Sequence, residues 1–470
     1  MSSAAATAQS YDRNKSNRIP VIRHLIASLA LLALAPAALA KDVAVTLGGD
    51  MIGPYRAMDG IDDPGFAEVV ALFRASDTGF ANQEGAIFDL ADFAGFPAAE
   101  TGGGYPLSPR ATATGLRAMG ITLVSKANNH ATDWGVPGLL ATRESLRAAG
   151  IVQAGTGDDP ASACAAAASG PVALVSAATT FPPMSLPVAA VSRRGLTSRP
   201  GPGICALHVR PVRLVTEGEL RTLRGIAGPL AMAGGPDGQD VRIADQHFRA
   251  APAPGLDWDM KDGDVATIMT AIGAAKPKAG LTLFAVHAHE TAGTADDMPA
   301  ADFEPLILHR ANEAPAADDP VPAAYVPTLL RQAVDAGADM VVRTGPHVLN
   351  GIELYRGKPI FYGLGSLFFD FGGRRSYTAP GGQTITLPPL WYETVIPVVT
   401  FRDGKLNEVR LHPATIDPDA GPSVGLPRRA HGEAARRILT RLVDLSRPYG
   451  TVIRIEGDTG IIRPVKGAPR

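Results

Sequence analysis

The sequence has 470 residues, of which 46% are hydrophobic and 19% charged, and its formal net charge is −2. This is an ordinary globular composition, and the length fits either one large α/β domain or two to three average domains. Because the charge is near neutral and no basic run stands out, the sequence does not have the character of a nucleic-acid-binding protein, and we expect no nucleic-acid partner.

Residues 1–40 differ in composition from the rest of the chain. Four basic residues precede the apolar run LIASLALLALAPAALA, which ends in Ala38-Leu39-Ala40. These are the parts of a secretory signal peptide, so we expect cleavage near Ala40 and a mature chain, residues 41–470, that is secreted, periplasmic or part of the cell envelope. The alternative is an uncleaved anchor, although Pro36 interrupts the run and the run is short for a membrane span.

The two cysteines of the chain, Cys164 and Cys205, both lie in the expected mature part. In an oxidising compartment they can form a disulfide, but the spacing alone does not separate a disulfide from two ordinary thiols. Two thiols are too few to form a zinc site by themselves.

Five short apolar runs rich in β-branched residues predict strands that are buried on both faces. They are VAVTL at 43–47, ITLVS at 121–125, PVALVS at 171–176, LTLFAV at 281–286 and ADMVV at 338–342. Helical spacing of Leu and Ala lies between them, at 65–76, 111–120, 137–150 and 327–337. The first of these helices has Asp63 as N-cap and Pro64 as first residue, and the others end at glycine.

Alternating strands and helices predict an α/β fold, in which chemistry gathers beyond the carboxyl ends of the strands. Two segments interrupt this pattern, and we expect them to be loop insertions. Residues 181–238 are rich in Pro, Gly and Arg, with one short helix near TEGELRTLRG, and residues 304–326 are rich in Ala, Pro and Asp. The tail from residue 432 predicts one helix followed by two short strands.

Polar side chains follow the predicted strands or occupy tight turns between them, and seven could form a site: Asp50, Glu84, Asn129, His130, His287, Glu290 and His347. Carboxylate, amide and imidazole groups together form a mixed nitrogen and oxygen ligand set that suits Zn²⁺, Mn²⁺ or Fe. A divalent metal held in this way would promote attack of water on phosphorus or on a carbonyl, and His130 would donate a proton to the leaving group. Each residue alone also has a structural interpretation, as a cap, a turn residue or a partner of loop carbonyls.

The order of several motifs resembles the CapA family, the poly-γ-glutamate capsule biosynthesis proteins of the metallophosphatase superfamily. The resemblance rests on VTLGGDMIG, ANQEGAIFD, KANNHATDWGVPGLLATRESLRAAGI, VHAHE and GADMVVRTGPHVLNGIELYRGKPIFYGLGSLFFD, and it covers roughly residues 43–413. It implies a four-layer α-β-β-α sandwich of the calcineurin-like phosphoesterase type. It also implies a role in making, exporting or anchoring an anionic γ-linked glutamate polymer.

The resemblance also implies roles for the candidate residues. The metal ligands would be Asp50, Glu84, Asn129, His287 and His347, the proton donor would be His130, and Glu290 would stand behind His287 as a second catalytic group. Two positions depart from the metallophosphatase pattern, because Ile52 and Thr344 occupy places where that superfamily has histidines. His289 is a candidate substitute.

Three functions fit these observations. The first is a CapA-like capsule protein with a metal site and hydrolase activity, together with capsule-synthesis membrane proteins as partners. The second is a periplasmic metal-dependent phosphoesterase that acts on phosphate esters, and the missing histidines weigh against it. The third is a non-catalytic module that binds an anionic polymer. The basic candidates for polymer binding are Arg193, Arg194, Arg199, Arg210 and Arg213.

Overall fold

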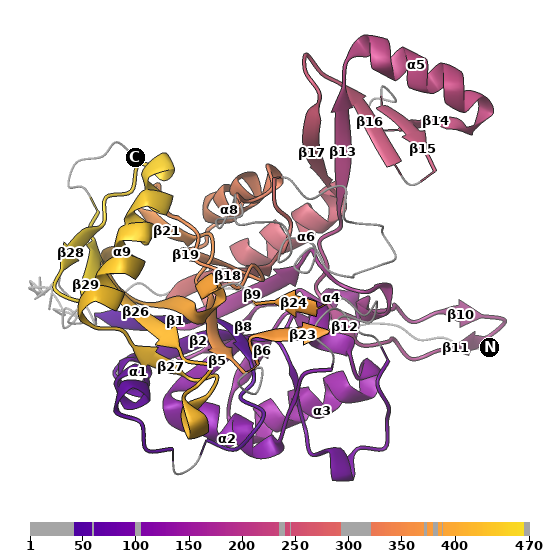
Figure 1. Cartoon of the computed structure of the whole chain (residues 1–470). Coiled ribbons are helices and arrows are strands. Elements are labelled where there is room, and N and C mark those ends of the chain that lie inside the picture. Colours follow the sequence, from indigo (N-terminus) through magenta and orange to yellow (C-terminus); the bar gives the residue numbers. More distant parts are fainter. Residues whose placement is uncertain are drawn as a thin grey trace, which may run out of the picture. The chain divides into compact units, whose positions relative to one another are not determined.

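The computed structural model describes residues 42–58, 61–98, 105–234, 240–244, 246–292, 321–370, 374–378, 384–387 and 389–464. The expected signal peptide and most of the expected 304–326 insertion lie outside these residues, and both stay predictions. The described chain is a mixed α/β structure with several sheets (Figure 1). None of its described helices has the length and apolar character required to cross a bilayer.

The largest sheet has the order β28-β29-β26-β25-β1-β2-β5-β6, with β22 also paired to β1 and β27 to β26. Its parallel part is formed by β6, β5, β2, β1 and β22, and its antiparallel part by β25 and the strands beyond it. The bounds of these strands are β1 Val43–Ile52, β2 Thr78–Gln83, β5 Ile121–Ser125, β6 Val152–Ala154, β22 Ser366–Phe369, β25 Glu393–Arg402, β26 Lys405–Ile416, β27 Pro427–Arg429, β28 Arg454–Glu456 and β29 Thr459–Ile462.

A second sheet has the order β20-β21-β19-β18-β9-β8, in which β9, β18, β19 and β21 are parallel. Its strands are β8 Ala167–Ser169, β9 Val172–Ala178, β18 Leu281–His287, β19 Met340–Thr344, β20 Ile352–Tyr355 and β21 Lys358–Phe361. All five predicted strands are therefore present, as β1, β5, β9, β18 and β19. The expectation of parallel strands with polar residues at their carboxyl ends holds in both sheets.

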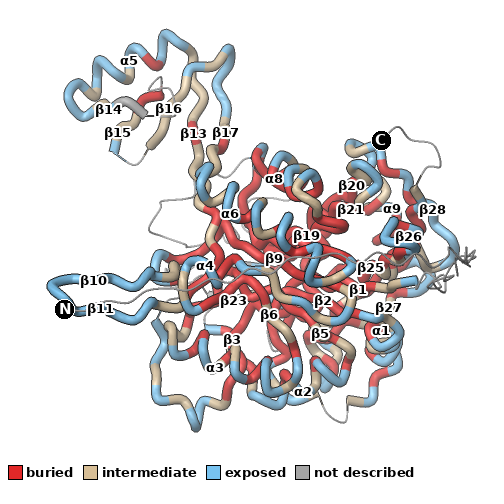
Figure 2. Tube along the Cα trace, turned by 180° about the vertical axis from the view of Figure 1, so that it is seen from behind, coloured by how far each residue is buried: buried red, intermediate tan, exposed pale blue. Residues whose placement is uncertain are grey.

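Alternation along the strands assigns their side chains to different apolar clusters. In β18, Leu283 belongs to a cluster shared by strands of both sheets, whereas Phe284 belongs to a cluster that includes residues of α6 (Asp262–Gly273) and α8 (Tyr325–Asp335). In β5, Leu123 joins the shared cluster, whereas Val124 packs with residues of α1 (Pro64–Arg74) and α2 (Arg110–Met119). Figure 2 shows these central strands buried along most of their length.

The predicted helix ends are confirmed. The side chain of Asp63 accepts a hydrogen bond of 3.0 Å from the backbone N–H of Phe66 and caps α1, which begins at Pro64. Helix α2 ends at Met119 and is capped by Gly120, whose φ of 107° is left-handed and suits a glycine cap. The remaining longer helices are α3 (Gly135–Ala148) and α9 (Gly432–Ser446), and α9 is the helix expected in the C-terminal tail.

The expectation of a mostly loop-like segment at 181–238 is wrong. The short helix is present as α5 (Glu217–Ala227), but residues 209–260 also form a five-stranded sheet of order β14-β15-β16-β13-β17. Its strands are β13 Val209–Val215, β14 Ala231–Gly234, β15 Asp240–Ile243, β16 Gln246–Ala250 and β17 Gly255–Met260. The rule that Pro- and Gly-rich sequence forms loops failed here because these strands pair with strands that follow residue 238.

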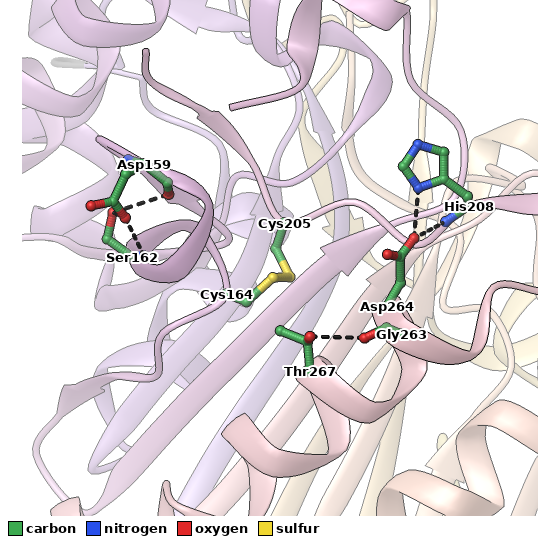
Figure 3. Close-up of a disulfide and its surroundings, with 8 residues drawn as sticks. All are labelled: Asp159, Ser162, Cys164, Cys205, His208, Gly263, Asp264 and Thr267. Carbon is green, nitrogen blue, oxygen red and sulfur yellow. Dashed lines mark hydrogen bonds and ion pairs between the residues drawn. A yellow bond between two sulfur atoms is a disulfide. The ribbon is translucent and has the colours of Figure 1, made fainter. Parts of the chain in front are cut away.

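Cys164 and Cys205 form a disulfide that closes a sequence separation of 41 residues (Figure 3). Cys164 follows the short helix α4 (Pro160–Ala163), and Cys205 follows β12 (Gly203–Ile204). Three residues beyond Cys205, His208 Nδ1 lies 2.6 Å from Asp264 Oδ2 of α6. The disulfide and this pair thus fix the chain immediately before it enters β13.

Candidate metal centre

The candidate ligands come from the carboxyl ends of strands in both sheets. Asp50 lies near the end of β1, His287 is the last residue of β18, and Asn129 begins a short 3₁₀ helix (Asn129–Thr132) after β5. Gly49 permits a close approach here, because a Cβ at this position would lie 1.7 Å from the carbonyl oxygen of Gly365. The backbone N–H of Asp50 donates to that same oxygen at 3.2 Å.

The first ligand group contains Glu84, His287 and His289, all buried, with one ligand atom of each within 4.8 Å of the others. His287 Nε2 lies 2.9 Å from His289 Nε2 and 3.5 Å from Glu84 Oε1. It also lies 2.9 Å from Asn129 Oδ1. Two imidazoles, a carboxylate and an amide oxygen therefore converge, and this nitrogen-rich set suits a transition metal such as Zn²⁺.

The second ligand group contains Asp50, Glu84 and His347, also buried and within the same 4.8 Å limit. His347 Nδ1 lies 3.3 Å from Asp50 Oδ2, and His347 Nε2 lies 3.9 Å from Glu84 Oε1. His347 has a φ of 57°, which is uncommon for a residue other than glycine. Glu84 belongs to both groups, so its carboxylate would contribute a ligand oxygen to a metal held by either of them.

The carboxylate of Glu84 is the strongest sign that these residues fit a metal. Its residue is fully buried, and both of its oxygens are without a hydrogen-bond partner among the described residues. Burial raises the pKa of Glu84 well above its ordinary value, and the negative charge of Asp50 raises it further, whereas Lys126 opposes the shift. A buried carboxylate is normally paired or bound to a metal, so a cation would remove this cost.

The two imidazoles of the first group are held in the neutral form that binds metals. Burial lowers the pKa of His287 and of His289 well below the ordinary value, and neighbouring positive charges lower both further. For Asp50, burial would raise the pKa, but His347, the Gly345 N–H and the Asn82 amide outweigh it and lower the pKa. The protein thus presents neutral nitrogens beside an ionised oxygen ligand.

His130 is oriented by a carboxylate. Its Nδ1 lies 2.6 Å from Asp133 Oδ2, and both side chains are buried. If Nδ1 carries the proton toward Asp133, Nε2 is the basic nitrogen of the neutral ring. This arrangement suits an acid or base whose ring orientation is fixed, and the aspartate three residues after His130 was visible in the sequence.

Glu290 lies behind the ligand groups and belongs to neither of them. Its carboxylate accepts hydrogen bonds from the hydroxyls of Tyr325 (2.8 Å), Thr179 (2.7 Å) and Thr180 (3.3 Å). The fully buried guanidinium of Arg343 donates to the carbonyl oxygen of Glu290 at 3.0 Å. These contacts fix the loop that carries His289, so the geometry gives Glu290 a positioning role.

Sequence reasoning missed two polar residues of this site. The Asn82 amide donates to Asp50 Oδ1 at 2.8 Å and lies 3.1 Å from His287 Nδ1, so it connects the two ligand groups. Lys126 is fully buried and donates to the carbonyl oxygen of Glu84 at 2.8 Å. Burial lowers the pKa of Lys126 to about 8. Asn82 comes two residues before Glu84 at the end of β2, which is the signal that could have found it.

The two departures from the metallophosphatase pattern have separate structural consequences. Thr344 Oγ1 lies 3.1 Å from His287 Nδ1, so its hydroxyl contacts a ligand histidine. Ile52 is buried in an apolar cluster that includes Phe369 and Trp391, and the Trp391 ring lies 5.3 Å from that of His347. The second ligand group therefore has an apolar wall at the position where the metallophosphatase pattern has a histidine.

Comparison with known proteins identifies similar sequences. Residues 44–371 match the family described as "Bacterial capsule synthesis protein PGA_cap". This match includes every candidate ligand of both groups. A shorter stretch of 42 residues, 9% of this chain, is 55% identical to the PGA biosynthesis protein CapA of Bacillus subtilis (strain 168) and covers 11% of that protein.

Two longer similarities are to proteins of Sinorhizobium fredii (strain NBRC 101917 / NGR234). Uncharacterized protein y4uA is 34% identical over 454 residues, which covers 88% of this chain and 92% of that protein. Uncharacterized protein y4sH is 33% identical over 454 residues with the same coverage. The similarity thus extends beyond the family match at residue 371 and includes most of the chain.

Proposed function

The chain belongs to the family of bacterial capsule synthesis proteins, PGA_cap, and from that premise we propose that it is an exported, metal-dependent hydrolase of capsule synthesis. Its substrate would be an anionic polymer of the γ-linked glutamate type, and its partners would be membrane proteins of the same synthesis system. We further propose that the two large sheets and their helices form the four-layer α-β-β-α sandwich of metallophosphatases. The three apolar clusters support this arrangement.

The single observation that carries the hydrolase proposal is the Glu84 carboxylate, buried between three histidines with neither oxygen hydrogen-bonded by a described residue. The ligands would be Asp50, Glu84, Asn129, His287, His289 and His347. A bound divalent cation would polarise a carbonyl or phosphoryl oxygen and lower the pKa of water.

The residues around the ligands would supply orientation and proton transfer. His130, fixed by Asp133, would deliver a proton to the leaving group of the scissile bond. The Thr344 hydroxyl would accept a hydrogen bond from Nδ1–H of His287, which leaves Nε2 unprotonated and directed at the other ligands. The Asn82 amide would hold Asp50 by donating to its Oδ1. Glu290 would hold the His289 loop through Thr180, because the Thr180 hydroxyl also accepts from the His289 N–H.

Export is supported by two independent features. The first forty residues have the composition of a signal peptide. The Cys164–Cys205 disulfide is of a kind that persists in oxidising compartments such as the periplasm and the cell exterior. Mass determination of the N-terminus of protein recovered from the periplasm would test cleavage near Ala40.

Turnover assays with two substrates would test the reaction class. The purified protein is incubated with Mn²⁺ or Zn²⁺ and either a γ-glutamyl oligopeptide or an aryl phosphodiester. The proposal expects hydrolysis of the peptide that is lost on chelation and in Asp50→Ala. Hydrolysis of the phosphodiester alone would favour a phosphoesterase, and no turnover of either substrate would favour a polymer-binding module.

A further inference from the structure

A short hairpin between Val188 and Gly201, which we call the basic hairpin, is exposed along its length (Figure 2). Its strands are β10 (Ser192–Arg193) and β11 (Leu196–Thr197), and Val188 pairs with Gly201 at its base. Arg194 and Gly195 form its turn, with φ values of 52° and 79°. Positive φ at both turn residues matches the twist of a two-residue hairpin.

The register of the basic hairpin separates its two faces. Arg193 is paired with Leu196, and the backbone N–H of Ser198 donates to the carbonyl oxygen of Val191 at 2.9 Å, so Val191, Arg193 and Leu196 share one face. The opposite face carries the hydroxyl pair Ser192 and Thr197, whose oxygens lie 3.1 Å apart. Leu196 is 78% exposed and Val191 is 57% exposed. One face therefore combines a cation with two exposed aliphatic side chains.

The basic hairpin lies in a stretch of the sequence that has no acidic residue. Between Asp159 and Glu217 the chain has five arginines and neither Asp nor Glu. Arg210 is paired with Asp259 in the sheet that follows, at 2.8 Å. By contrast, the arginines of the basic hairpin, Arg193, Arg194 and Arg199, are exposed and form no ion pair with another described residue.

We propose that the basic hairpin docks this protein onto an anionic lipid bilayer. The three arginines would contact lipid phosphates, which match the donor geometry of guanidinium. Leu196 and Val191 would enter the boundary between headgroups and acyl chains, where apolar side chains are removed from water while the hairpin stays at the membrane surface. The docking surface is separate in sequence from the metal ligands and does not depend on their chemistry.

A polycarboxylate chain is the competing occupant, and the structure favours the bilayer over it. A γ-linked glutamate polymer would satisfy the arginines through its carboxylates. Its repeat has only short methylene segments between charged carboxylates and polar amides, which is little apolar surface to cover Leu196, Val191 and Val188, all more than half exposed. A bilayer contact buries both kinds of side chain at once.

Vesicle partitioning would test the proposal. The whole chain is mixed with vesicles of phosphatidylcholine alone or with 30% phosphatidylglycerol, and bound protein is measured by co-sedimentation. Each arginine near an anionic surface contributes about fivefold in binding, so we expect Arg193→Gln/Arg194→Gln/Arg199→Gln to lower partitioning by about 100-fold. The matched control changes three exposed arginines elsewhere, Arg117→Gln/Arg436→Gln/Arg454→Gln, and is expected to bind like the wild type.

A local probe excludes a contribution from residues 1–41, which both variants retain. Tryptophan introduced as Leu196→Trp should shift its emission to shorter wavelength when phosphatidylglycerol vesicles are added. Equal partitioning of the hairpin variant and the control, or an unchanged emission, would overturn the proposal. Loss of binding to soluble polyglutamate instead of vesicles would assign the hairpin to polymer. Loss of self-association instead would assign it to a second copy of the chain.

Discussion

The Nε2 atoms of His287 and His289 lie 2.9 Å apart in a buried setting. Neutral imidazoles at this distance can share only one proton, and burial lowers the pKa of both rings. Glu84 Oε1 lies 3.5 Å from His287 Nε2, so a carboxylate oxygen is adjacent to the two imidazole nitrogens. This arrangement is consistent with two ligands of a divalent metal site, and several measurable consequences follow from that proposal.

Replacing Glu84 with Gln should stabilise the metal-free protein at pH 8. Burial raises the pKa of Glu84, so its contribution to the stability of the folded state is present in full below the ordinary pKa of 4.5, where the carboxyl is protonated in the folded and the unfolded chain. This contribution is lost as the pH rises toward the raised pKa, because the carboxyl ionises more readily in the unfolded chain. We expect the free energy of unfolding in urea and chelator to increase by roughly 1–3 kcal/mol, because Gln carries no charge to desolvate. The exposed Glu456→Gln should change it by less than about 0.5 kcal/mol. A loss of stability in Glu84→Gln would contradict the buried-charge assignment.

The metal-free protein should lose stability as the pH falls below 6.5. The pKa values of His287 and His289 are lowered in the folded state, so their contribution to folding stability is present in full above the ordinary pKa of 6.5. As the pH falls below 6.5 this contribution is lost, because the histidines of the unfolded chain take up protons before those of the folded chain do. The measurement is urea unfolding between pH 7.5 and 5 in a Glu84→Gln background, where the opposite effect of Glu84 is absent. Adding His287→Asn and His289→Asn should flatten the profile, and an unchanged slope would count against buried neutral imidazoles.

Removing the proposed proton donor should lower turnover without releasing metal. We expect His130→Gln to lower kcat by about 10²- to 10⁴-fold, with Asp133→Asn less severe, because general acid catalysis commonly contributes that much. The control is His208→Gln, since His208 and Asp264 have the same 2.6 Å contact as His130 and Asp133. Metal content of each variant is measured in parallel. An equal loss of turnover in the control would remove the special role of His130.

Breaking the disulfide should destabilise the chain in proportion to the loop that it closes. For a separation of 41 residues, loss of the crosslink in Cys164→Ala/Cys205→Ala should lower the free energy of unfolding by about 3–4 kcal/mol. Urea unfolding of the variant beside oxidised and reduced wild type measures this directly. The reduced wild type should match the variant, and equal midpoints for all three samples would contradict a stabilising disulfide.

Much of the framework could be predicted from the sequence, because local rules decide it. Runs such as LTLFAV identify a strand without knowledge of its neighbours, and Asp63 and Pro64 mark a helix start by capping chemistry alone. The placement of polar residues at carboxyl ends was equally predictable, because parallel strands bring those ends together.

The remaining features depend on contacts between distant segments. Asn82 was missed because its importance comes from Asp50 and His287, which lie 32 and 205 residues away. The sheet at 209–260 was missed because its strands pair across the end of the segment read as loop. The resemblance implies a catalytic role for Glu290, whereas in the structure its carboxylate contacts three hydroxyls behind the ligands.

The central claim is that Glu84, His287 and His289 hold a divalent cation, and equilibrium dialysis with elemental analysis tests it most directly. Chelator-stripped protein is dialysed against Zn²⁺ or Mn²⁺, and bound metal is counted for the wild type, Glu84→Gln, His287→Ala and, as control, His412→Ala, a residue of β26 that belongs to neither ligand group. We predict at least one tightly bound ion in the wild type and the control, and affinity lowered at least 10- to 100-fold in the two ligand variants. No bound ion in the wild type, or equal binding in all four proteins, would contradict the account.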